Sequence, residues 1–401
     1  MLSKKVFFPG LNALRFFAAS AVVFTHVELM KKFLGHSSHW IDPAQRIKTT
    51  AFEAMQRREF SWVSPLIANA GSLAVVFFFV LSGFLITFLL LEEQQQTATI
   101  SVRKFYMRRI LRIWPLYFLV AALGFFVLPH FGVFDVPVQQ PEFEEHFWVN
   151  LLLYVGMLPN LAFALFMAVP NIGQLWSIGV EEQFYLVWPV LVKKSKSPLR
   201  AIMIVFAVAV GLKAGVLLWS ELSGWELKEL KKFLAMLRIE SMAIGGVGAY
   251  LWFTNKEKWM NLILRPVVEW AAWISIPMLI YFSPMLIQNG VHLIYSISFL
   301  IIIINVAKKG KFIISLETPI FDYLGKLSYG IYMYHLMIVV FSIHLLDAVF
   351  HFPSDLKLIH HVSIYALSFT LTIIVSALSY EFFEKRFVSA KKKYALVESG
   401  S

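Results

Sequence analysis

Two ionisable side chains, Arg15 and His26, stand within the first long apolar stretch of the chain, residues 11–30. In a helix their spacing amounts to three turns and about 20°, so both would lie on one face, about 16 Å apart along the axis. An ionisable group inside an apolar helix is costly and is a candidate for function. Histidine suits acid–base chemistry near neutral pH, so we predict His26 as a catalytic residue together with Arg15. A snorkelling arginine and a hydrogen-bonded core histidine are the structural alternatives.

A second apolar stretch, residues 174–192, carries two adjacent carboxylates, Glu181 and Glu182. Ser177 and Glu181 would share a helix face, whereas Glu182 would point about 100° away. Counted from the outer end of this stretch, the carboxylates lie about 10–12 Å deep, near the level expected for His26. We therefore predict that Glu181 or Glu182 orients His26 and stabilises its protonated form. A structural glutamate bound to the backbone or to an arginine is the alternative.

Three further side chains are candidates for lining the same cavity: Ser177, Tyr185 and His335. His335 would lie at a similar depth in another apolar stretch, although a packing role is equally compatible with its position. The chain has no cysteine, which removes thiol nucleophiles and zinc–thiolate sites. It also has no P-loop, His-Glu-x-x-His or Gly-x-Ser-x-Gly pattern, and we predict no metal site.

A basic cluster, Arg108, Arg109 and Arg112, follows the apolar stretch at residues 72–91. Arg109 and Arg112 are three residues apart and would be neighbours on a helix. Guanidinium groups bind phosphate through paired hydrogen bonds, so the cluster is a candidate site for a phosphate-rich ligand. Anchoring to the cytoplasmic membrane surface is the alternative.

The composition indicates what must position these residues. Of the 401 residues, 58% are hydrophobic and 15% are charged, and the mean hydropathy is +0.68. Soluble globular domains contain fewer apolar and more charged residues than this chain. Disordered chains are also poorer in aromatic residues and richer in charge. The chain is therefore predicted to be an all-α integral membrane protein. Its net charge of +11 is explained by basic loops at the membrane surface, and no nucleic-acid partner is predicted.

A membrane-spanning helix needs about 20 apolar residues, and ten stretches are candidates. These are residues 11–30, 72–91, 113–129, 174–192, 201–219, 239–253, 267–285, 291–307, 321–345 and 360–383. An eleventh, 149–169, contains Asn150, Pro159 and Asn160. If it does not span, the inner loops hold twice as many Lys and Arg as the outer loops, although they are shorter. The positive-inside rule thus favours ten spans, with 149–169 re-entrant or interfacial.

This topology places both termini in the cytoplasm and predicts a multi-pass protein of the bacterial inner membrane. Residues 1–390 are predicted to form one domain, and 391–401 a short basic cytoplasmic tail that contacts lipid. A cleaved signal peptide ending at Ala19-Ser20-Ala21 is the alternative for the N-terminus, but Arg15 argues against it. Two Gly-rich stretches, Gly211–Gly215 and Gly245–Gly248, are predicted to allow close helix packing.

Taken together, six segments resemble the membrane acyltransferase 3 family and cover almost the whole chain. They are Arg15-x10-His26, Phe79-Val-Leu-Ser-Gly-Phe-Leu-Ile86, Arg109-x-x-Arg112 with Pro115, Trp176-Ser177 with Glu181-Glu-Gln-Phe-Tyr185, Ser328-Tyr329 with Tyr332 and His335, and Tyr380-Glu-Phe-Phe-Glu384. The chain departs from the usual family pattern at Gly179, Tyr334 and Arg386. These departures affect the expected identity of the acceptor and not the expected class of reaction.

The resemblance implies a ten-helix core and an O-acyltransferase that takes an acyl group, expected to be acetyl, from cytoplasmic acetyl-CoA. The acceptor would be a hydroxyl of a cell-surface or lipid-linked carbohydrate. By the same resemblance, Arg15 and His26 are essential, and Arg109 and Arg112, with Arg108 beside them, would contact the CoA phosphates. The chain is expected to be the form without a fused SGNH hydrolase-like domain. Outer loops 31–71 and 130–173 are expected to select the acceptor.

Two questions stay open at this level. His26 could act as a general base or could carry the acyl group itself. A transporter or exporter of glycan intermediates, with the same polar residues as a proton relay, is the functional alternative.

Overall fold

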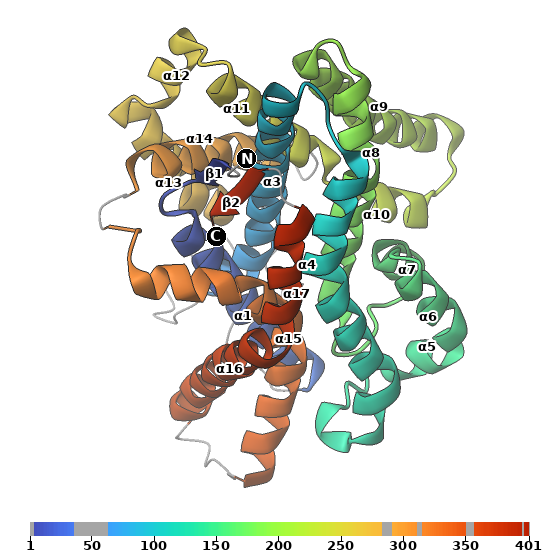
Figure 1. Ribbon diagram of the computed structural model, residues 1–401. Helices are drawn as coiled ribbons and strands as arrows, with labels where there is room; N and C mark the ends of the chain where they lie inside the picture. The colour runs from blue at the N-terminus through green and yellow to red at the C-terminus, as the bar shows by residue number, and fades with distance from the viewer. Residues whose placement is uncertain are drawn as a thin grey trace.

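The computed structural model describes residues 4–35, 63–282, 291–310, 315–349, 357–394 and 397–400, which form a helical bundle (Figure 1). The long helices are α1 (Leu11–Phe33), α3 (Val63–Thr97), α4 (Val102–Ala122), α8 (Trp176–Lys194), α9 (Pro198–Ser223), α11 (Ile239–Phe253), α13 (Pro266–Phe282), α14 (Val291–Lys309), α15 (Pro319–Val349) and α16 (Lys357–Ser379). The predicted all-α membrane fold is confirmed. Each of the ten apolar stretches coincides with one of these helices.

Eight helices of the described chain are long and apolar enough to cross a bilayer, and a ninth span results if the bent pair α12 (Glu257–Ile263) and α13 is one span. The bend between the two is 56°. The expected tenth span, α8, is a helix of 19 residues but carries Glu181, Glu182, Lys193 and Lys194. Its polar content therefore separates it from the apolar helices, and the expected count of ten exceeds what length and composition support.

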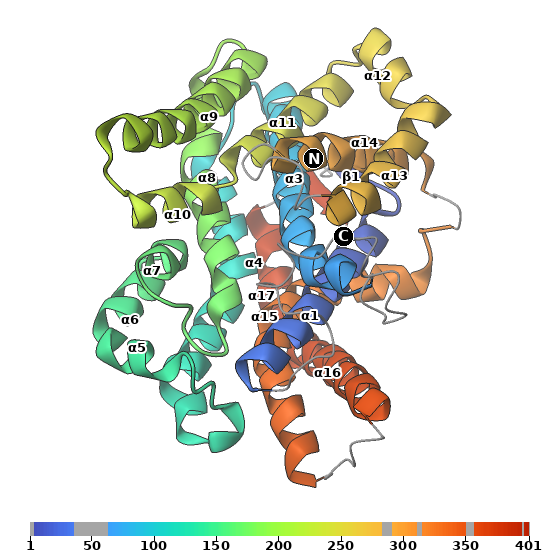
Figure 2. The same cartoon turned by 180° about the vertical axis from the view of Figure 1, so that it is seen from behind.

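The segment 149–169 does not form one long helix. It is divided between α6 (Phe147–Val155) and α7 (Pro159–Leu165), which are nine and seven residues long. Neither could cross about 30 Å of hydrocarbon, which agrees with the expected re-entrant or interfacial segment. Together with α5 (Gln140–Glu145) they lie at the edge of the bundle, where α7 packs on α8 and on α10 (Lys228–Met236) (Figure 2).

The centre of the bundle is α3, which packs on α1, α11 and α14. Its contact with α11 is close because both helices present glycine: a Cβ on Gly83 would lie 2.0 Å from the Met242 carbonyl oxygen, and one on Gly245 2.0 Å from that of Val80. The predicted role of Gly245–Gly248 in close packing is therefore confirmed. The same prediction for Gly211–Gly215 is wrong, because added Cβ atoms there would meet nothing within 4 Å.

The two ends of the described chain lie side by side (Figure 1). Strands β1 (Lys4–Phe7) and β2 (Val397–Gly400) pair in parallel, with Lys4 opposite Val397. Between α16 and β2 the chain passes through a π-helical turn at Tyr380–Glu384 and the short helix α17 (Lys385–Lys391), which packs on α4. Shorter turns occur at Leu123–Val127, Leu128–His130, Gly132–Phe134, Gly173–Leu175 and Lys392–Tyr394.

Candidate active site

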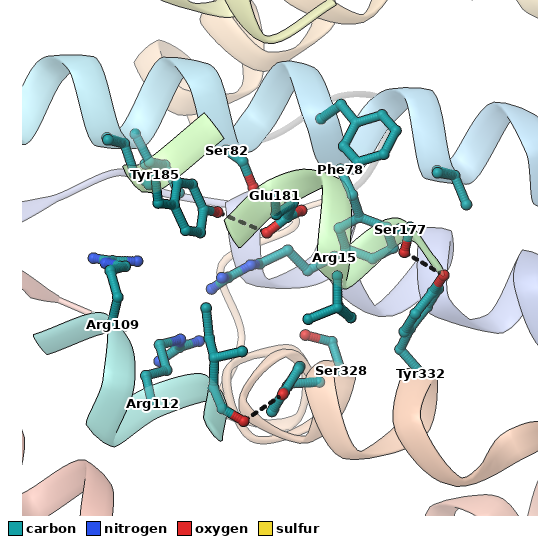
Figure 3. Close-up of a pocket in the computed structure, with 17 residues that line it drawn as sticks. Arg15, Phe78, Ser82, Arg109, Arg112, Ser177, Glu181, Tyr185, Ser328 and Tyr332 are labelled. Atoms are coloured by element: carbon teal, nitrogen blue, oxygen red, sulfur yellow. Dashed lines mark hydrogen bonds between the residues drawn. The ribbon is translucent and has the colours of Figure 1, made fainter. Parts of the chain in front are cut away.

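A cavity of about 110 Å³ lies between α1, α3, α4, α8 and α15 (Figure 3). Six of the predicted site residues line it: Arg15, Arg109, Arg112, Ser177, Glu181 and Tyr185. In Figure 3 the guanidinium groups of Arg109 and Arg112 lie at one end, Ser177 and Tyr332 at the other, and Arg15 between them. The long axis of the cavity therefore connects a cationic end with a hydroxyl-bearing end.

The cationic end is built from three arginines on two helices. Arg15 comes from α1, and Arg109 and Arg112 come from successive turns of α4. The Arg109 guanidinium lies over the rings of Phe105 and Tyr185, 5.7 and 5.9 Å from their centroids, and its buried Nε has no hydrogen-bond partner. Within the described residues, none of the three guanidinium groups forms an ion pair with a carboxylate. Clustered, unpaired guanidinium groups favour a bound anion.

Lys391 adds a fourth cation, which our sequence interpretation placed in the tail rather than in the site. It lines a smaller cavity of about 60 Å³ together with Arg15, Arg109 and Arg112. The chain that follows it is held nearby, because Tyr394 accepts a hydrogen bond of 2.9 Å from Arg108 through its carbonyl oxygen. No sequence pattern pointed to Lys391, since it is one of three consecutive lysines.

Arg108 has contacts unlike those expected of a residue that binds phosphate. It is buried, and its guanidinium forms an ion pair of 2.9 Å with Glu93 in addition to the bond to Tyr394. It does not line the arginine cavity, although Arg109 beside it does. The reason is helix geometry: neighbouring residues point about 100° apart, so only one of the two can face the cavity.

The two glutamates are bound to other partners than His26. Glu181 accepts hydrogen bonds from Ser82 (3.1 Å) and Tyr185 (2.6 Å), and Glu182 accepts one from Trp114 (2.9 Å). Glu181 lines the first cavity together with Arg15, and His26 does not line that cavity. The predicted pairing of a glutamate with His26 is not present, because α8 begins only at Trp176 and its first turn, at Ser177, already meets Tyr332 on α15.

The partner of His26 is His335. Nδ1 of His26 lies 2.9 Å from the Val22 carbonyl oxygen and 3.3 Å from Nε2 of His335. Nδ1 of His335 in turn lies 2.7 Å from the carbonyl oxygen of Tyr332. Since carbonyl oxygens only accept, we assign the proton to Nδ1 in both rings. The one Nδ1 proton of His26 is then shared between the Val22 carbonyl oxygen and Nε2 of His335, and Nε2 of His26 keeps a free lone pair.

His26 lines a second cavity, of about 290 Å³, near the far end of α1 from Arg15. Different residues line the two cavities. A short hydrogen-bonded group lies between them: the hydroxyls of Ser177 and Tyr332 are 2.6 Å apart, and Tyr332 donates to the Gln174 carbonyl oxygen at 3.0 Å. Gln174, Trp176 and His26 belong to the second cavity, whereas Ser177 and Tyr332 belong to the first.

Three residues of this arrangement were not among the predicted site residues: Ser82, Gln174 and Tyr332, although Ser82 and Tyr332 belong to segments that carried the family resemblance. Each is a polar side chain in an apolar helix or at its end, which is the signal that selected His26 and Glu181. Their partners could not be found in that way, because they lie on other helices.

The expected acceptor loop 130–173 contributes Gln139, Phe163 and Met167 to the second cavity. Of the other expected acceptor loop, 31–71, residues 36–62 lie outside the described residues. Among the described residues, no three His, Asp or Glu side chains are grouped closely enough to hold a metal ion.

Comparison with known proteins gives the family. The chain is 24% identical over 393 residues to the O-acetyltransferase OatA of Staphylococcus aureus (strain NCTC 8325 / PS 47), covering 94% of this chain and 57% of that protein. It is 28% identical over 334 residues to the putative O-acetyltransferase SACOL0978 of S. aureus (strain COL), covering 80% and 53%. The chain thus spans little more than half the length of these curated relatives. No solved structure matches it.

A family model described as an acyltransferase domain matches residues 8–381. This range includes every residue that lines the first and second cavities; of the smaller arginine cavity, Val6 and Lys391 lie outside it. It also contains five of the six segments on which the sequence resemblance rested, and the first two residues of the sixth, Tyr380–Glu384. The resemblance is confirmed, and the chain belongs to the acyltransferase 3 family.

Proposed function

We propose that this protein is a membrane O-acetyltransferase that moves an acetyl group from acetyl-CoA to a hydroxyl of a carbohydrate. The observation that carries the proposal is the placement of three unpaired guanidinium groups in one cavity and a histidine with a free lone pair in an adjoining one. The first suits a phosphate-rich donor, and the second suits a base that acts on an acceptor.

The donor would bind with its phosphates at Arg109, Arg112 and Lys391. These side chains lie at the end of the bundle where basic loop residues collect, which is expected to be the cytoplasmic side. The narrow pantetheine arm would follow the cavity past Arg15 toward Ser177 and Tyr332 (Figure 3). Arg15 and His26 are about 16 Å apart on α1, so an extended arm is needed to bring the thioester near the histidine.

The acceptor would enter the second cavity. Nε2 of His26 removes the proton of the acceptor hydroxyl while its oxygen attacks the thioester carbonyl carbon. The carbon–sulfur bond then breaks, and the CoA sulfur takes the proton from His26, so that the products are an acetyl ester and CoA. His26 lines the second cavity and not the first, which favours a base on the acceptor side over an acyl-histidine.

His335 supports this role. When Nε2 of His26 takes the proton, the ring becomes a cation, and its Nδ1–H bond to Nε2 of His335 becomes charge-assisted. From the sequence, a glutamate was expected to stabilise the protonated His26 in this way. Glu181 and Glu182 instead act as positioning residues: Glu181 holds the Tyr185 ring on which Arg109 lies, and Glu182 holds Trp114.

Donor binding tests the proposal directly. Purified protein in detergent should be stabilised against heat by acetyl-CoA and by CoA, because a ligand that binds the folded state raises its melting temperature. Arg109→Ala with Arg112→Ala should remove that stabilisation. His26→Ala should keep it and lose acetyl transfer. A protein that neither acetyl-CoA nor CoA stabilises would contradict the proposal and favour transport.

A further inference from the structure

The second cavity contains a buried hydrogen-bond acceptor with no partner. Gln174 is 2% exposed, and its side chain lines the cavity. Its Nε2 donates to the Met333 carbonyl oxygen at 2.7 Å, which fixes the amide. Its Oε1 is buried and accepts no hydrogen bond within the described residues. An unpaired buried carbonyl is unfavourable, and a donor group on a bound ligand would remove that cost.

The other walls indicate what kind of ligand carries that donor. Trp176 supplies aromatic surface, and Leu29, Met30 and Leu336 are aliphatic, whereas one face of the Phe163 ring is covered by the Lys232 ammonium, 4.8 Å from its centroid. The faces of aromatic rings carry partial negative charge and attract polarised C–H groups. A volume of about 290 Å³ lies at the lower end of small-molecule sites, which are about 300–1,000 Å³. A single ring that combines C–H faces with hydroxyl groups matches this cavity.

The place of Gln174 relative to His26 is fixed by one helix. Gln174 is bound to the carbonyl of Met333, and His335, two residues further along α15, is bound to Nδ1 of His26. The amide oxygen and the free Nε2 of His26 therefore belong to groups held by the same turn of α15. Both side chains line the second cavity, so a ring that fills it would meet both.

We infer that the second cavity is a binding subsite for one hexopyranose ring of the acceptor, in which Gln174 Oε1 accepts a hydrogen bond from the hydroxyl next to the one that is acetylated. The inference rests on the proposed function and makes it more specific. Gln174 is a positioning residue here: its bond places the neighbouring hydroxyl at Nε2 of His26. An acceptor without that second hydroxyl leaves the amide oxygen unpaired.

The test measures transfer from radiolabelled acetyl-CoA to methyl glucopyranoside, to its monodeoxy derivatives and to cyclohexylmethanol, which has one hydroxyl and no neighbour. Gln174→Met should raise the KM for the glucoside about ten-fold, the effect of one hydrogen bond of about 1.4 kcal/mol. One deoxy derivative should show the same loss with the unchanged protein and no further loss with the variant. Transfer to cyclohexylmethanol should not change.

Two further variants separate positioning from damage to the fold. Gln140→Met is the matched control, because Gln140 donates to Glu144 on α5 and does not line the cavity; it should leave the glucoside KM unchanged. Trp176→Leu should raise that KM, and Trp176→Phe should retain most of the affinity. If Gln174→Met does not fold, as judged by lost stabilisation with CoA, the tryptophan pair and the deoxy series carry the test.

The outcomes distinguish this inference from the proposed function. If CoA stabilises the protein but the glucoside and cyclohexylmethanol are equal acceptors, or no hexopyranoside is acetylated, the inference is overturned and donor binding stands. An unchanged glucoside KM in Gln174→Met would overturn it as well. If neither CoA nor acetyl-CoA stabilises the protein, the proposed function itself fails.

Discussion

Nε2 of His335 lies 3.3 Å from Nδ1 of His26, and the two rings belong to helices that are far apart in the sequence, α15 and α1. His335 is fully buried, and its own Nδ1 is held by the Tyr332 carbonyl. It therefore has no proton to offer His26 and can only accept one hydrogen bond from it. This arrangement fixes the orientation of His26 and leaves its Nε2 for chemistry.

His335→Leu should lower kcat for acetyl transfer about 100-fold, within the range of general acid–base effects, because the protonated His26 loses its acceptor. His335→Gln should recover part of the rate, since the Gln amide oxygen can also accept. Stabilisation by CoA should be the same in both variants. Full activity in His335→Leu would show that the histidine contact has no part in the reaction.

Glu181→Gln should weaken donor binding more than it lowers kcat. Glu181 accepts from Tyr185, the ring on which Arg109 lies, and does not touch His26. Loss of its charge should therefore loosen Arg109 and raise the KM for acetyl-CoA about five-fold, the effect of one hydrogen bond of about 1 kcal/mol. A large fall in kcat with an unchanged acetyl-CoA KM would instead indicate that Glu181 stabilises His26 directly.

Arg108→Ala and Arg109→Ala should affect different properties of the protein, although the residues are adjacent. Arg108→Ala leaves Glu93 buried without its partner, which should cost about 3 kcal/mol of stability without changing CoA affinity. Arg109 has no carboxylate partner, so Arg109→Ala should reduce CoA affinity with a smaller effect on melting temperature. The two variants are compared by their melting temperatures with and without CoA.

Lys391→Ala should weaken CoA binding about ten-fold and make the remaining affinity less sensitive to salt, because one cation is removed from a charged site. Lys393→Ala is the matched control: Lys393 is exposed and does not line either arginine-containing cavity. Equal effects of both variants would indicate only a general surface charge. Binding is measured by calorimetry at two salt concentrations.

Gly83→Ala should destabilise the bundle by about 3 kcal/mol, as in other overpacked interiors, because its new methyl group would meet the backbone of Met242. Gly211→Ala is the control, since that position has open space and a helical alanine is favoured over glycine. Its melting temperature should not fall. A stable Gly83→Ala protein would mean that α3 and α11 are not packed so closely.

The sequence by itself determined the fold class and the rough position of the chemistry. The apolar stretches predicted the helices, polar residues within them selected Arg15, His26 and Glu181, and the basic cluster between two stretches selected Arg109. A helical repeat also placed Arg15 and His26 on one face of α1 at a known separation, because both belong to one regular element. Such relations within one helix depend only on local geometry.

The partners of these residues were decided by the tertiary structure. Which side chain of α8 or α15 lies opposite His26 depends on where each helix begins, how it tilts and how closely glycines let it approach. A shift of one turn, about 5.4 Å, replaces one partner with another. That is why His335 and not a glutamate meets His26, why Arg109 and not Arg108 faces the cavity, and why Lys391 joins the arginines from the far end of the chain.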